Sequence, residues 1–277
     1  MIQVSGRPFQ LPTSWNLDDT EKMIFQSLED APSLYSYPSS RGLYFEIKFR
    51  KNIIDSAREM KASEAIFSSF LRARCNPQYW EKTNAGGFLL KPNVNPADAI
   101  LDIYQNGALY AFECATACVI VLYHALIKSM GKTFFNSYFQ NLYLYSWHTD
   151  DDLKIHTFYG DHFLPGDIIY FNNPDFSPTT PWFRGVNAVV LGNDQFFGHG
   201  FAIKNADEFI ETLNRKRKPD SETSAYLTNL VTRPVFSQLG NQAGRFTQPI
   251  RHRVIHHNRN SLCRAHYLIY LRQYLNQ

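Results

Sequence analysis

The sequence contains few cysteines, and none of them forms a recognisable motif. Its 277 residues include four, namely Cys75, Cys114, Cys118 and Cys263. No Cys-x-x-Cys pair is present, which argues against a zinc or redox motif, and four scattered thiols are too few for a disulfide framework. Each thiol must therefore be judged by its own surroundings.

Long hydrophobic runs and a strong net charge are also missing. The longest apolar stretch, near residues 114–127, is interrupted by Thr116 and His124. It falls short of the roughly 18–20 residues that cross a bilayer. The formal net charge is only +3, from 28 basic and 25 acidic residues, so the electrostatic signature of a nucleic-acid-binding protein is absent. We expect a protein that binds neither membrane nor nucleic acid.

The first residues, MIQVSGRPFQ, lack the features of a secretory signal. Such a signal needs a charged segment, an apolar run and a small-residue cleavage site. We therefore expect no signal peptide and synthesis in the cytoplasm. With 44% hydrophobic and 15% aromatic residues, the chain has enough material for a packed core. We expect a globular monomer.

Hydrophobic periodicity predicts helices in the first half of the chain and strands in the second. Apolar residues recur at helical spacing over about 53–71 and 95–106, and the segment 113–130 is apolar on nearly every face. A later helix should begin at Asn205, with an Asn-x-x-Glu capping box. The predicted strands are 142–147, 167–171, 186–191 and 200–203. Helices followed by strands are typical of an α+β domain.

Cys114 stands where a polar segment enters the apolar helix, in the stretch YAFECATACVIV. A helix N-terminus stabilises a thiolate through its partial positive charge and its unpaired N–H groups. Cys118, one turn deeper, should face the interior. Two interpretations of Cys114 remain open at this point: a nucleophile, or a small core residue of the kind common in apolar helices.

A cysteine nucleophile normally needs a proton acceptor, usually a histidine that the fold brings close. His199, in FFGHGF, has the most suggestive setting, because glycines on both sides let other groups approach its ring. A cysteine on a helix N-terminus followed by a histidine on a small antiparallel sheet is similar to papain-like enzymes of the bacterial cell-wall amidase kind. We therefore predict a papain-like core, with a central cysteine-bearing helix packed on a small antiparallel sheet and surrounded by helices.

Longer blocks of sequence resemble the calcium-independent bacterial transglutaminases of the spore coat, the protein-glutamine γ-glutamyltransferases. The blocks are YAFECATA around Cys114, GDIIYFNNPDF at 166–176, FRG-x-N at 183–187 and LG-x-D-x-FF-x-HG at 191–200. The resemblance covers about residues 1–240. We expect a single catalytic domain over residues 1–246, and a C-terminal segment, 247–277, that is either a native extension or an appended tail. The histidines and the cysteine of that segment fit no standard zinc spacing, so we predict no metal site.

The resemblance implies a cysteine mechanism. Cys114 would attack the γ-carboxamide of a glutamine side chain, ammonia would leave, and a lysine amine would take the acyl group to form an isopeptide bond. No cofactor is needed, because the nucleophile belongs to the protein. The implied partners are spore-coat proteins that carry glutamine and lysine, and the implied destination is the spore coat.

The thioester must also be protected from water. Several aromatic residues match or neighbour positions where the family lines an access tunnel, and we expect them to bind substrate or to pack in the core. These residues are Phe67, Trp147, Tyr170, Trp182 and Phe183. Asn187 is expected to orient a group by hydrogen bonding, since an amide cannot accept a proton at neutral pH.

One position departs from the family pattern. The family has a catalytic glutamate directly after the glycine that corresponds to Gly185, and this chain has Val186 there. Our hypothesis is that Cys114 works with His199 and with Glu113, the residue before it. Two alternatives stay open: a glutamine deamidase or amidase in which water takes the acyl group, and a structural coat protein that has lost catalysis.

Overall fold

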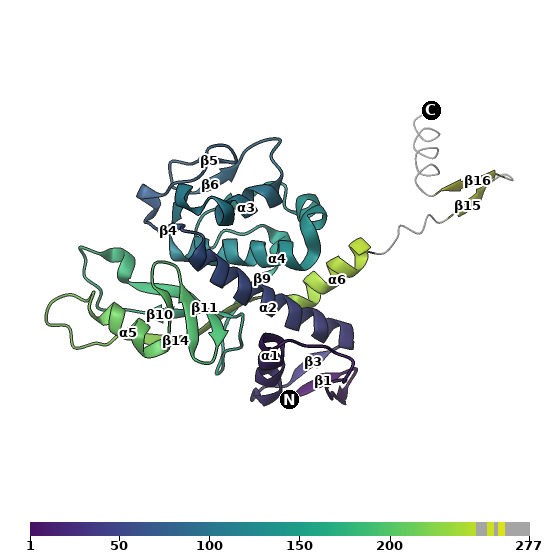
Figure 1. The fold of residues 1–277 in the computed structure, drawn as a ribbon, viewed down its shortest axis with the longest axis horizontal. Coiled ribbons are helices and arrows are strands. Elements are labelled where there is room, and N and C mark those ends of the chain that lie inside the picture. Colours follow the sequence, from purple (N-terminus) through teal and green to yellow (C-terminus); the bar gives the residue numbers. More distant parts are fainter. Residues whose placement is uncertain (248–253, 258–259, 264–277) are drawn as a thin grey trace. The chain divides into compact units, whose positions relative to one another are not determined.

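A computed structural model describes residues 1–247, 254–257 and 260–263 (Figure 1). The chain forms two compact units, residues 1–240 and 241–277. The first unit contains every candidate site residue named above. In the second unit the described residues are the end of helix α6 (Phe236–Thr247) and two antiparallel strands, β15 (Val254–His257) and β16 (Asn260–Cys263). The remainder of the predicted segment 247–277 lies outside the described residues.

The protein is a mixed α+β structure, as the order of the predicted elements indicated. The other helices are α1 (Asp19–Asp30), α2 (Ser40–Ala62), α3 (Pro96–Gln105), α4 (Cys114–Tyr138) and α5 (Ala206–Asn214), with single 3-10 turns η1 (Phe70–Arg72), η2 (Gly107–Leu109), η3 (Asp151–Leu153) and η4 (Pro181–Phe183). The first eight strands are β1 (Ile2–Val4), β2 (Arg7–Pro8), β3 (Tyr35–Tyr37), β4 (Ile66–Phe67), β5 (Trp80–Lys82), β6 (Phe88–Leu90), β7 (Ala111–Phe112) and β8 (Tyr143–Leu144). The remaining strands of the first unit are β9 (Ile155–Tyr159), β10 (Ile168–Asn172), β11 (Gly185–Gly192), β12 (Gln195–Gly198), β13 (Ala202–Lys204) and β14 (Tyr226–Pro234).

The main sheet has six antiparallel strands in the order β13-β12-β11-β10-β14-β9. Because side chains alternate along a strand, its two faces enter different hydrophobic clusters. Ile168 and Val189 belong to the large core that includes α2 and α4, whereas Phe171 and Val186 belong to a smaller cluster with Phe209 of α5. The sheet is therefore a middle layer, with the cysteine-bearing helix on one side and α5 on the other.

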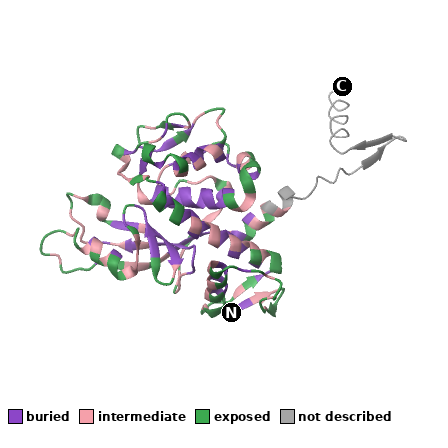
Figure 2. Ribbon diagram, viewed as in Figure 1, coloured by how far each residue is buried: buried purple, intermediate pink, exposed green. Residues whose placement is uncertain are grey.

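Helix α4 begins at Cys114, within a residue of the predicted start, and it is the central buried helix (Figure 2). On length and composition alone it could cross a membrane, with a mean hydropathy of 1.5, but 72% of that stretch is buried inside the protein, as in a core helix. Gly131, predicted to end the helix, has φ of +83°, and it separates a regular first part from a second helical part that ends at Tyr138.

The prediction of a helix over residues 53–71 was wrong in its bounds. Helix α2 starts at Ser40 and ends at Ala62, and the chain then forms β4 and η1. The first turns of α2 were missed because charged residues occupy part of its buried face. Arg50 and Glu46 are both buried there, so the hydrophobic period is broken at core positions.

Arg50 is the centre of a buried ionic cluster that ties α2 to the main sheet. Its guanidinium donates to Glu46 Oε1 and to Asp167 Oδ1, each at 2.8 Å, and Arg233 of β14 contacts the other oxygen of Asp167. Removing one member of such a cluster would leave an unpaired buried charge, which is costly. The cluster therefore fixes the start of β10, the strand that carries Tyr170.

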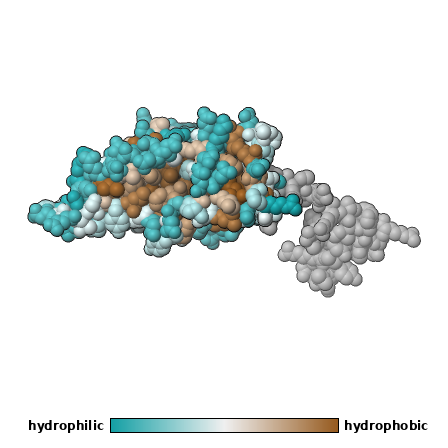
Figure 3. Space-filling model, turned by 90° about the horizontal axis from the view of Figure 1, so that it is seen from below, coloured by the Kyte–Doolittle hydropathy of each residue, from teal (hydrophilic) through white to brown (hydrophobic). Residues whose placement is uncertain are grey.

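Strand β4 places Phe67 beside the beginning of α4. It pairs in parallel with β7, so that Phe67 lies opposite Phe112, two residues before Cys114. Gly200, with φ of +86°, makes this packing possible, because a Cβ on this residue would lie 2.6 Å from the Cβ of Phe67. On the face drawn in Figure 3, hydrophobic side chains are visible in several patches between hydrophilic ones.

Candidate active site

Cys114 is the first residue of α4, and Glu113 is its N-cap. The Glu113 carboxylate accepts hydrogen bonds from the backbone N–H groups of Ala115 and Thr116, each at 2.7 Å. A carboxylate at this position satisfies free amides and is favoured by the helix dipole. The local sequence therefore explains why the helix starts at the cysteine and presents its sulfur at a helix end.

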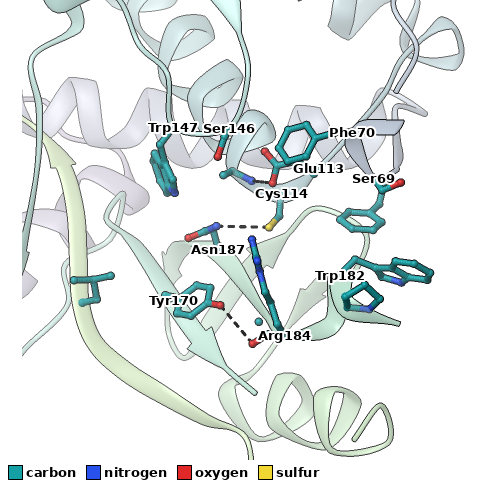
Figure 4. A pocket seen from close by; sticks show the side chains of 15 residues that line it. Ser69, Phe70, Glu113, Cys114, Ser146, Trp147, Tyr170, Trp182, Arg184 and Asn187 are labelled. Carbon is teal, nitrogen blue, oxygen red and sulfur yellow. Dashed lines mark hydrogen bonds between the residues drawn. The ribbon is translucent and has the colours of Figure 1, made fainter. Parts of the chain in front are cut away.

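The thiol opens into a pocket of about 460 Å³ (Figure 4). The walls come from segments far apart in the sequence: the β4–η1 region, the start of α4, the turn after β8, and the segment from η4 into β11. The lining residues are Phe67, Ser69, Phe70, Glu113, Cys114, Ala115, Ser146, Trp147, Tyr170, Pro181, Trp182, Arg184, Gly185, Asn187 and Leu230. A pocket of this size and aromatic character can take a long, narrow side chain.

Asn187 of β11 is the polar group in contact with the sulfur. Its side-chain amide donates to Cys114 Sγ at 3.6 Å, and it lies opposite Tyr170 in the register of β10 and β11. Position 185 requires a glycine, because a Cβ at that position would lie 2.2 Å from the Tyr170 hydroxyl oxygen. The predicted role of Asn187 as a hydrogen-bonding residue thus has a definite partner, the thiol itself.

The resting thiol is protonated at neutral pH. Burial and the negative charge of Glu113 raise the pKa of Cys114 to about 11, while hydrogen bonds from Asn187 act in the opposite direction. A neutral thiol is a weak nucleophile, so catalysis needs groups that favour the thiolate when substrate is bound.

His199 is not among the residues that line the pocket. It lies in the turn between β12 and β13, is 4% exposed, and stacks on Phe112 with ring centroids 4.7 Å apart. Its Nε2 atom has no hydrogen-bond partner within the described part of the chain. Burial lowers the pKa of His199 to about 4. No hydrogen bond joins this imidazole to the thiol within the described residues, and their predicted pairing stays a prediction.

The burial of His199 predicts acid sensitivity. Because its pKa in the folded protein, about 4, lies below the ordinary value of 6.5, its contribution to stability is complete above pH 6.5 and is lost as the pH falls towards 4. At about 1.4 kcal/mol per pKa unit the loss is about 3 kcal/mol. We expect His199→Gln to lose less stability than wild type between pH 7.5 and pH 4.5 in urea unfolding. Equal losses in the two proteins would contradict this assignment. His124, which titrates in both, cancels in the comparison.

Val186 does not occupy an empty place beside the thiol. Neighbouring residues on β11 point to opposite faces, and Asn187 is the one that reaches Cys114. The Val186 side chain is fully buried in the cluster that contains Phe171 and Phe209, and Cys114 packs at the margin of that cluster. In this register the side chain at position 186, where the family has its glutamate, is on the face of β11 opposite to Asn187.

Most of the predicted aromatic residues do line the pocket. Phe67, Trp147, Tyr170 and Trp182 surround the approach to Cys114. Phe183 does not, since its ring packs against Phe201 and belongs to the smaller hydrophobic cluster. For Phe183 the core interpretation is the correct one.

Several pocket residues were missed in the sequence, among them Phe70, Ser146 and Arg184. Figure 4 shows the Arg184 side chain extending from the end of η4 towards the sulfur. Arg184 lies within the FRG-x-N block, which could have drawn attention to it, whereas Phe70 and Ser146 carry no local signal. Within the described residues, no three His, Cys, Asp or Glu side chains lie together as metal ligands would.

Comparison with known proteins adds independent information. The family model described as protein-glutamine gamma-glutamyltransferase matches residues 1–243. The protein-glutamine gamma-glutamyltransferase of Halalkalibacterium halodurans is 51% identical over 275 residues, covering 98% of this chain and 97% of the relative. The Bacillus cereus protein of the same name is 44% identical over 213 residues, with 77% of each chain covered. Because the first match covers nearly the whole chain, the segment 247–277 has a counterpart in that relative.

Similarity extends to a solved structure, the transglutaminase of Geobacillus stearothermophilus without its C-terminal extension. It is 47% identical, has a TM-score of 0.71, and covers 74% of this chain and 98% of its own. Family model, relatives and solved structure all point to the same family. The chain belongs to the bacterial protein-glutamine γ-glutamyltransferase family and is an enzyme that cross-links proteins.

Proposed function

We propose that Cys114 is the nucleophile of this transglutaminase. The observation that carries the proposal is its position: the sulfur lies at the N-terminus of a buried helix and opens into an aromatic pocket with a hydrogen-bond donor beside it. Sγ would attack the glutamine γ-carbonyl carbon, a C–S bond would form, and the C–N bond would break to release ammonia. The lysine amine would then displace the sulfur and complete the isopeptide bond.

Three features support formation of the thiolate without a carboxylate at position 186. The amide of Asn187 donates to the sulfur. The amides at the start of α4 supply partial positive charge, which the Glu113 carboxylate partly offsets by accepting from two of them. The side chain of Arg184 extends into the same space (Figure 4), and a nearby cation favours a thiolate. Together they replace the predicted group of Cys114, His199 and Glu113 as our hypothesis for activating the thiol.

The substrates of a transglutaminase are proteins that carry glutamine and lysine. The surroundings of the pocket suit such macromolecular substrates, because exposed hydrophobic side chains adjoin the lining. Ile66 and Leu71 are 52% and 86% exposed, and each neighbours a lining residue; Trp182, itself a lining residue, is 44% exposed. Exposed apolar groups near a cleft are typical of protein-binding surfaces.

We further propose that the protein acts as a monomer on spore-coat proteins, is made in the cytoplasm and is deposited on the spore coat. The resemblance of its sequence blocks to spore-coat transglutaminases supports this proposal. We also propose that the cysteine-bearing helix and the sheet form a papain-like core. Detection of the protein in purified coat fractions of spores would test the location. Its absence there would refute the proposed destination.

The nucleophile can be tested by trapping the acyl-enzyme. A glutamine peptide supplied without any amine should raise the mass of the enzyme by the mass of the peptide less that of ammonia, and the adduct should map to Cys114. Hydroxylamine should remove it, since it cleaves thioesters. When an amine is then added, ammonia release with no amine transfer would favour the deamidase, and the lack of both would favour the inactive coat protein. An adduct on another residue would refute the proposal.

A further inference from the structure

The carboxylate of Glu113 is committed to the helix start and to one side chain beyond it. In addition to the two backbone amides, its Oε1 accepts from the Thr116 hydroxyl at 2.8 Å. These three hydrogen bonds hold the carboxylate next to the thiol, and its interaction with Cys114 is among the causes that raise the pKa of that thiol. Several donors at one carboxylate fix its orientation. Glu113 therefore acts in this geometry as an anchor for Thr116.

Thr116 connects this anchor to the wall of the pocket. Its hydroxyl donates to Glu113 and accepts from the backbone N–H of Ser146 at 2.9 Å. Thr116 is only 3% exposed, so water has little access to these bonds. Since a hydroxyl has one hydrogen to donate, its direction is fixed by the carboxylate, and its lone pairs face Ser146.

Ser146 lies in a tight turn whose backbone is unusual. Its φ is +49°, in the left-handed region that non-glycine residues seldom occupy, and the turn is closed by a hydrogen bond from His148 N–H to the Tyr145 carbonyl. Such conformations persist where surrounding contacts determine them. Ser146 and the next residue, Trp147, both line the pocket next to Cys114 (Figure 4).

We propose that Thr116 is a positioning residue for the transfer step. The hydrogen-bonded chain from Glu113 through Thr116 to Ser146 couples the helix that carries the nucleophile to the turn that carries Trp147. With the turn in place, the indole covers one side of the thioester and restricts water, so that the amine takes the acyl group. The inference rests on the proposed function of Cys114 and concerns the partition of its acyl-enzyme between amine and water.

The test compares Thr116→Val, which keeps the shape but loses the hydroxyl, with Thr116→Ser, which keeps the hydroxyl. The measurement is the amount of fluorescent amine incorporated per ammonia released. We expect the ratio to fall about five-fold in Thr116→Val, the change that corresponds to about 1 kcal/mol for one buried hydrogen bond, and to stay within two-fold of wild type in Thr116→Ser. An unchanged ratio in Thr116→Val, or an equal fall in both variants, would overturn the proposal.

A double-mutant comparison identifies the route. If Thr116 acts through Trp147, Thr116→Val should lower the ratio in wild type and have no further effect in Trp147→Ala. Additive effects would contradict that route. If Thr116→Val does not fold, Thr116→Ala replaces it, with the same expected result. Lack of ammonia release in the wild type would count against the proposed function, whereas normal release with an unchanged ratio would count against this inference alone.

Discussion

Replacing Cys114 with alanine should abolish both ammonia release and amine incorporation. Without the nucleophile the enzyme can still bind substrate, but it has no atom that forms the thioester. Removal of a catalytic nucleophile lowers kcat on the order of 10⁶-fold. The expected rate lies below detection. Because the sulfur of Cys114 opens into the pocket and is not packed tightly in the core, alanine should fit there with little effect on folding.

Cys118 provides a matched control on the same helix. It lies one turn further along α4, is 4% exposed, and burial raises its pKa well above the ordinary value. Cys118→Ala should retain the activity of wild type for each folded molecule, with a modest loss of stability from the smaller core side chain. If Cys114→Ala kept measurable transfer, or if Cys118→Ala lost it while folded, the assignment of the nucleophile would be wrong.

Val186→Glu should destabilise the protein instead of supplying a missing base. The Val186 side chain is fully buried among Phe171, Phe209 and their neighbours. An unpaired carboxyl group in such surroundings is desolvated, and the packing of the valine is lost as well. We expect the free energy of unfolding to fall by at least about 3 kcal/mol. Urea unfolding of the purified variant would measure this cost.

Asn187→Glu should be compared with Val186→Glu, because the side chain of residue 187 lies on the face of β11 that contacts the sulfur of Cys114. Here a carboxylate would stand beside the thiol in partly exposed surroundings. We expect this variant to remain folded, and its thiol to change in reactivity towards iodoacetamide across the pH range. A stable Val186→Glu protein with increased amine incorporation would refute the assignment of residue 186 to the opposite face of β11. It would show that a carboxylate at position 186 contacts Cys114.

Local sequence determined the features of this protein that depend on neighbouring residues. Glu113 before Cys114 predicts the start of α4, because a carboxylate caps free amides. The pair Asn205 and Glu208 predicts the capping box of α5 in the same way, and both of its hydrogen bonds are present. The strand that carries Asn187 followed from a run of β-branched residues between turns, and it is β11.

Which residue meets the thiol was decided only by the tertiary structure. Position 186 attracted attention because it matches a family residue, yet strand alternation and the pairing of β10 with β11 bring Asn187 to the sulfur. His199 had a favourable local setting, but packing between Phe112 and Phe67 buries it away from the pocket. Such outcomes depend on register and layer packing, which join segments far apart in the chain.

The residues in the walls of the pocket could not be predicted from local sequence either. No sequence motif marks Ser146. Its backbone N–H is joined to the start of α4 by a hydrogen bond to a threonine 30 residues earlier. Arg184 and Phe70 come from two other segments and come together only in the walls of the pocket around Cys114. The amino-acid sequence by itself determined the helix that begins at Cys114 and the family. The arrangement that activates the thiol and shields the thioester is a product of long-range contacts, because no local pattern specifies which distant backbone amide a buried hydroxyl will meet.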